Sequence, residues 1–175
     1  MQNKVVHTLA RAMQELGAAT VRFNFRGVGA SAGTHDEGRG EIDDAVAVAG
    51  WARTRWRCER LWLAGFSFGA AVALQAAPRL STERLVTVAP PVGRLGLDRR
   101  PRRPQAAWLI VQGDADELVD AAEVARWAAG YEPRPELVEL KGAEHFFHGR
   151  LTELRELVKG FLGGPAQGGV MRPQG

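Results

Sequence analysis

The stretch that most constrains this chain runs over residues 61–77. It begins with four apolar residues, continues as Gly65-Phe66-Ser67-Phe68-Gly69, and ends in an alanine-rich run that stops before a proline. A short apolar run followed by glycine predicts a buried strand, and an alanine-rich run ended by proline predicts a helix. The stretch therefore predicts a strand, a tight turn that contains Ser67, and a helix.

Two glycines flank the serine at equal spacing, a pattern typical of a nucleophile elbow. A serine at such a turn has a strained backbone, and we expect a side chain at Gly65 or Gly69 to collide with the neighbouring strand or helix. Ser67 Oγ would then be exposed at the carboxyl end of the strand. The N–H of Phe68 would lie at the helix N-terminus, where it can donate to a developing oxyanion. These features make Ser67 a candidate nucleophile.

The length and composition of the chain indicate one globular domain. Of the 175 residues, 45% are hydrophobic and 25% are charged, which excludes a disordered or fibrous protein. A chain of this length forms one core rather than two. Residues 164–175 are rich in glycine, proline and glutamine, and they predict a disordered tail. We therefore expect a single domain over residues 1–163.

The composition predicts neither a membrane nor a nucleic-acid partner. No apolar run approaches the length that crosses a bilayer, and the N-terminus opens into an amphipathic helix rather than a signal peptide. The single cysteine, Cys58, fits a reducing compartment, so we expect a cytoplasmic protein. The formal net charge is only +3, and the basic cluster over residues 99–103 has no interleaved aromatic residues for base stacking.

Strands and helices alternate along the chain. The apolar patterns predict helices over residues 3–16, 41–56, 121–129 and from about 151 to 161, and they predict strands over residues 19–25, 85–89, 108–112 and 137–140 besides the strand before Ser67. This alternation favours an α/β fold with a mostly parallel sheet and helices on both faces. Asp43 and Asp44 lie in the first turns of one predicted helix, and we interpret them as surface charges rather than a metal pair.

Acidic residues and a histidine directly follow the last two predicted strands. Asp114 and Asp116 come after one strand, and His145 comes after the next. Because the carboxyl ends of parallel strands meet at one edge of a sheet, we expect these side chains to lie beside Ser67. The order serine, aspartate, histidine is that of a catalytic triad on such a sheet. Either aspartate is a candidate for the acid that orients the histidine.

His145 is the preferred general base among the four histidines. His7 lies on an amphipathic helix and His35 in a polar loop, and we expect both at the surface. His148 is one helical turn past His145, and we expect it to belong to the last helix. Only His145 lies at the predicted junction between loop and helix.

Together these motifs resemble the α/β-hydrolase superfamily, and within it the small bacterial dienelactone hydrolases and carboxylesterases. The resemblance covers about residues 3–162 and rests on four segments, which are residues 23–31, 65–69, 113–119 and 142–148. It implies that Ser67 is the nucleophile, that His145 is the general base and then the general acid, and that Asp116 orients His145. The family's acid comes three residues after the glycine, so Asp114 is left as a turn residue that accepts local backbone N–H bonds.

The resemblance also implies a reaction, which is cleavage of a carboxylic ester or thioester of a small acyl substrate through an acyl-enzyme. The Phe68 N–H would receive the oxyanion, and neither a metal nor a cofactor is needed. The loop between residues 89 and 108 is too short for a helical lid, so we expect an open site. Two alternatives stay open: an inactive hydrolase-like protein or truncated fragment, and, less favoured, a peptidase.

The sequence departs from the family pattern at its N-terminus. In the family, three strands precede the first helix, and the loop after the third supplies a second oxyanion N–H. This chain opens at that helix, so the fold is expected to be N-terminally truncated. We expect that Met1 is an internal methionine. The upstream DNA, read in the same frame, should encode about 30 to 45 more residues with apolar strands and a glycine-rich loop. The form with 175 residues would then be poorly soluble and at best weakly active.

Overall fold

The structure, a computed structural model, describes residues 3–97 and 100–164. The elements in chain order are α1 (Lys4–Glu15), α2 (Arg39–Trp56), β1 (Trp62–Phe66), α3 (Phe68–Ala76), the 3₁₀ turn η1 (Ala77–Arg79), β2 (Arg84–Val88), β3 (Ala107–Gly113), α4 (Ala121–Ala128), β4 (Glu136–Leu140) and α5 (Leu151–Gly163). The predicted tail, apart from Gly164, lies outside the described residues. No helix within those residues is both long enough and apolar enough to cross a bilayer.

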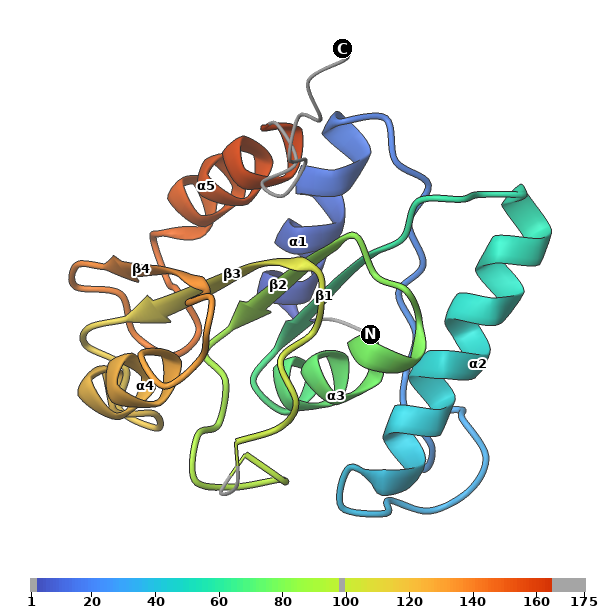
Figure 1. Ribbon diagram of the computed structural model, residues 1–175, viewed down its shortest axis with the longest axis horizontal. Coiled ribbons are helices and arrows are strands. Elements are labelled where there is room, and N and C mark those ends of the chain that lie inside the picture. The colour runs from blue at the N-terminus through green and yellow to red at the C-terminus, as the bar shows by residue number, and fades with distance from the viewer. Residues whose placement is uncertain (1–2, 98–99, 165–175) are drawn as a thin grey trace, which may run out of the picture.

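The four strands form one parallel sheet in the order β1-β2-β3-β4, with helices on both faces (Figure 1). Helices α1 and α5 cover one face, where Val86, Val88 and Val111 are fully buried. Helices α3 and α4 cover the other face, over Leu85 and Ile110, and α2 packs on α3. Because side chains alternate along a strand, neighbouring residues of β2 supply the two cores. The predicted fold class is therefore confirmed.

The strand predicted over residues 19–25 does not form. This segment has no regular secondary structure, although Val21, Phe23 and Phe25 alternate with polar residues as they do in a half-buried strand. A strand exists only where its backbone pairs with a neighbour. Within the described residues, strand β1 pairs with β2 alone, and its other edge has no strand beside it. The alternating pattern was thus present without the partner that would make it a strand.

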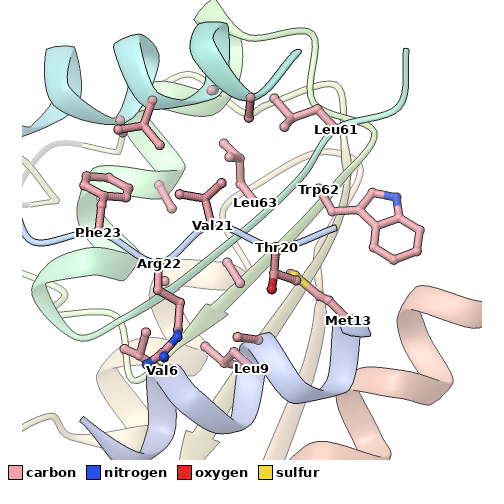
Figure 2. A pocket seen from close by; sticks show the side chains of 18 of the residues that line it. Val6, Leu9, Met13, Thr20, Val21, Arg22, Phe23, Leu61, Trp62 and Leu63 are labelled. Atoms are coloured by element: carbon pink, nitrogen blue, oxygen red, sulfur yellow. The ribbon is translucent and has the colours of Figure 1, made fainter. Parts of the chain in front are cut away.

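An apolar groove of about 620 Å³ separates residues 18–25 from strand β1. Figure 2 shows Val6, Leu9 and Met13 of α1 on one side of it, with the segment that contains Val21 running across and Leu63 of β1 behind. Exposed apolar side chains at Leu16, Val21 and Trp56 also belong to its lining. The groove therefore runs along the edge of β1 that has no neighbouring strand among the described residues.

The turn between β1 and α3 depends on a close approach at Gly65. A β-carbon added to Gly65 would overlap the carbonyl group of Gly69, which is backbone and cannot swing away. The same construction at Gly69 meets no atom within 4 Å, so the predicted collision at Gly69 is wrong. Gly69 lines the groove, so open space lies beside it. Of the two glycines of this turn, only Gly65 is therefore sterically required.

The two glycines of the turn give a matched pair of substitutions. We expect Gly65→Ala to lower the free energy of unfolding by about 2 kcal/mol or more, because the overlap forces β1 and α3 apart. Gly69→Ala should change it by less than about 1 kcal/mol, since alanine also favours the helix. Urea denaturation of both variants measures the difference. Equal losses at the two positions would contradict the proposed contact.

Candidate active site

The structure brings the predicted nucleophile, base and acid into one hydrogen-bonded chain. Ser67 Oγ lies 3.2 Å from His145 Nε2, and His145 Nδ1 lies 2.8 Å from Asp116 Oδ2. The side chains of His145 and Asp116 are 3% and 0% exposed. A carboxylate only accepts hydrogen bonds, so Nδ1–H donates to Asp116 and Nε2 of the neutral ring faces the serine hydroxyl. This arrangement lets Nε2 accept the proton of Ser67.

Strained backbone holds the serine at the end of β1. Ser67 has φ 51° and ψ −119°, which a residue with a side chain rarely adopts. Its N–H donates to Val88 O of the neighbouring strand, so the turn is tied to the sheet. The next residue, Phe68, begins α3, and its N–H has no acceptor among residues 3–97 and 100–164. That free donor is where the sequence predicts one half of an oxyanion hole.

The two aspartates after β3 have different partners. Asp116 Oδ1 accepts from the N–H groups of Leu118 and Val119, while Oδ2 faces His145. Asp114 does not contact His145; its Oδ1 accepts from Gly142 N–H at 2.5 Å. The expectation that Asp114 accepts local N–H groups is therefore wrong, because its donor lies 28 residues later in the chain. The geometry makes Asp116, and not Asp114, the partner of the histidine.

Backbone contacts join the loop after β3 to the loop that contains His145. Ala115 N–H donates to Ala143 O, and His145 N–H donates to Glu117 Oε2 at 3.3 Å. A β-carbon at Gly113 would overlap the Ala143 carbonyl, so glycine permits the two loops to touch. Together with the bond from Gly142 to Asp114, these contacts fix His145 relative to Asp116.

The other histidines lie away from this chain of bonds. His7 is exposed on α1, as expected. His35 is also exposed, but its Nδ1 lies 2.8 Å from the buried carboxylate of Glu41 and its ring lies beside that of Phe68. The prediction that His148 belongs to the last helix is wrong, because α5 begins at Leu151.

An ion pair anchors the glycine-rich loop after the unformed strand. Arg26 donates to both carboxylate oxygens of Asp44 from its guanidinium, and its backbone N–H also donates to Asp44 Oδ2. The hydrogen bonds from the Arg26 guanidinium lower the pKa of Asp44 below its ordinary value. Asp44 is partly buried, with 23% of its side chain exposed, whereas Asp43 is 63% exposed and pairs with Arg79. Among the residues that the structure describes, no cluster of His, Cys, Asp or Glu could hold a metal ion.

Two buried residues of the site were missed in the sequence. Gln112 is fully buried at the end of β3 and donates to Asp116 Oδ2 at 3.0 Å. Glu41 is also fully buried and accepts from the N–H groups of Asp36 and Gly38 at the start of α2. Gln112 carries no motif. Glu41 has a local signal, because it is the third residue of α2 and its side chain accepts from the N-cap backbone of Gly38, as the acid of a capping box does.

Comparison with known proteins gives a consistent result. Residues 2–103 match the family described as "Serine aminopeptidase, S33". A solved Xanthomonas campestris structure, described as a serine hydrolase "without lid", is 48% identical with a TM-score of 0.87, and the match covers 93% of this chain and 73% of that one. A solved serine-hydrolase homologue from Coxiella burnetii is also 48% identical, with a TM-score of 0.86 over 91% of this chain and 76% of that one.

A curated relative extends the comparison. An uncharacterized Rickettsia prowazekii protein is 30% identical over 171 residues, which is 93% of this chain and 72% of the relative. The matched family covers more than half of the chain, and the solved structures share its fold at close to half sequence identity. This chain belongs to the serine-aminopeptidase (S33) family of the α/β-hydrolase superfamily.

Proposed function

We propose that this protein is a serine hydrolase that cleaves a carboxylic ester or thioester. The observation that carries the proposal is the bonded series from Ser67 Oγ through His145 to Asp116. In it, Ser67 is the nucleophile, His145 is the general base and then the general acid, and Asp116 orients the imidazole. The substrate is a small acyl compound, and neither a metal nor a cofactor takes part.

The reaction proceeds in two acyl-transfer steps. Ser67 Oγ attacks the carbonyl carbon while His145 Nε2 takes its proton, and the Phe68 N–H stabilises the oxyanion. His145 then gives the proton to the leaving alcohol or thiol, which leaves an acyl-serine. Water, deprotonated by the same nitrogen, releases the acid and restores the hydroxyl of Ser67.

Two features near the triad favour an accessible, partly apolar substrate. Within the described residues, the connection between β2 and β3 contains no helix that could serve as a lid. Phe146, next to the proposed base, is 44% exposed, and its ring packs edge-on against that of His145. An exposed aromatic face beside the reacting groups can bind an apolar part of the ester.

Aminopeptidase activity is a second candidate because of the description of the matched family. Hydrolysis of aminoacyl p-nitroanilides, compared with p-nitrophenyl acetate, separates the two activities. An inactive or truncated protein is the remaining alternative, and it is favoured by the single oxyanion donor identified at Phe68. The absence of both activities, and of labelling by a serine-directed phosphonate, would support it.

Removing the nucleophile tests the proposal directly. We expect Ser67→Ala to lower ester turnover by about a million-fold, because the acyl-enzyme cannot form. Its unfolding curve should stay close to that of the parent protein. Turnover of p-nitrophenyl acetate by the purified variant, with the phosphonate-treated parent as control, is the measurement. Activity near the parent level would exclude Ser67 as nucleophile.

The two aspartates provide a matched test of the orienting acid. Asp116→Asn should lower turnover by about 10,000-fold, since an amide can donate to Nδ1 and so favour the wrong tautomer. Asp114→Asn keeps an oxygen that can accept from Gly142 N–H, so its turnover should fall by less than about tenfold. A larger loss at Asp114, at equal thermal stability, would show that the assignment is reversed.

A further inference from the structure

Gln112 is a buried polar side chain that the proposed mechanism does not yet use. It is the next-to-last residue of strand β3, and its side chain is fully buried. Burial of an amide costs free energy unless its polar atoms form hydrogen bonds. The hydrogen bonds of its amide nitrogen, and the lack of one at its amide oxygen, therefore indicate its role.

The amide nitrogen of Gln112 is surrounded by acceptors. Nε2 lies 3.0 Å from Asp116 Oδ2 and 3.2 Å from the carbonyl oxygens of Gly113 and Val119. Because all three neighbours only accept, the nitrogen and not the oxygen of the amide must face them. The orientation of the side chain is thus determined by its surroundings.

The amide oxygen of Gln112 has no partner among the residues that the structure describes. An unpaired buried acceptor lowers stability, which offsets the gain from the nitrogen. Stability alone is therefore a poor explanation for a glutamine here. The specific feature of the side chain is its donation to Asp116.

Asp116 accepts hydrogen bonds on both carboxylate oxygens. Leu118 and Val119 donate to Oδ1, while His145 and Gln112 both donate to Oδ2. The backbone donors fix one oxygen, and Gln112 fixes the oxygen that receives His145 Nδ1–H. We propose that Gln112 is a positioning residue, which holds Asp116 Oδ2 where it orients and stabilises the His145 ring.

This inference rests on the proposed triad and adds a fourth member that touches no reacting atom. When Nε2 takes the proton of Ser67, the ring becomes positive and its bond to Asp116 strengthens. Because Gln112 already holds Asp116 Oδ2 in place, this oxygen stabilises the positive His145 ring without having to move. Loss of Gln112 should therefore slow the acyl-transfer step and leave substrate binding unchanged.

The test replaces the amide with apolar and shortened side chains. We expect Gln112→Met, which is similar in shape, to lower kcat for p-nitrophenyl acetate about tenfold with little change in KM. Gln112→Asn keeps an amide that is too short to reach Asp116 and should give the same loss. It serves as the readout if the methionine variant does not fold.

Thr87→Val is the matched control. Thr87 is a fully buried polar residue of the neighbouring strand, and its Oγ1 accepts from Trp108 Nε1. It makes no hydrogen bond to the triad among the described residues. This variant should lose stability while kcat stays within about twofold of the parent value.

A double variant tests whether Gln112 acts through Asp116. In an Asp116→Asn background, Gln112→Met should cause no further loss of kcat, because its effect acts through Asp116.

A readout that needs no turnover separates this proposal from the proposed function. The downfield proton resonance of His145 Nδ1–H should shift in Gln112→Met and Gln112→Asn, and it should stay unchanged in Thr87→Val. A shift in a protein without esterase activity would support the role of Gln112 and contradict the proposed reaction. Unchanged kcat and an unchanged resonance in a folded Gln112 variant would overturn the inference.

Discussion

The contact between Gly65 and the carbonyl of Gly69 is the constraint on which the rest of the site depends. It lets α3 begin directly after β1, so that one residue between strand and helix makes the whole turn. That residue, Ser67, then has a positive φ and a hydroxyl free of its own backbone. The helix places an unpaired N–H beside this hydroxyl. A bulkier residue at position 65 would separate the nucleophile from that donor.

The rest of the sheet supplies the partners of Ser67 through its parallel topology. Strands β3 and β4 end at the same edge as β1, and the residues just past their ends are Asp116 and His145. For this reason Ser67, His145 and a pair of candidate aspartates could be predicted from chain order, while the choice of Asp116 over Asp114 came from the family resemblance. Parallel pairing converts positions far apart in sequence into neighbours.

Prediction from sequence failed where the outcome depends on a partner segment. Residues 19–25 alternate as a strand does, yet strand formation needs a neighbour, and the local pattern contains no information about one. The partners of Asp114 and Asp44 were missed for a similar reason. Gly142 and Arg26 lie on loops that are distant in sequence, so local charge and spacing suggested a turn residue and a surface charge instead. The residues that follow the strands could be placed from the sequence, whereas specific contacts between separate loops could not.

Strand β1 links the site to the apolar groove, yet the two depend on different edges of that strand. The hydrogen bond from Ser67 N–H to Val88 O holds the turn from the β2 side, as does the bond from Ala89 N–H to Val111 O one strand further. The groove lies along the opposite edge, between β1 and residues 18–25. Its lining also includes Phe66 and Phe68, the residues on either side of Ser67. The bonds that hold the turn thus come from the β2 side, whereas the unpaired backbone of β1 along the groove is an edge to which an extended segment can pair.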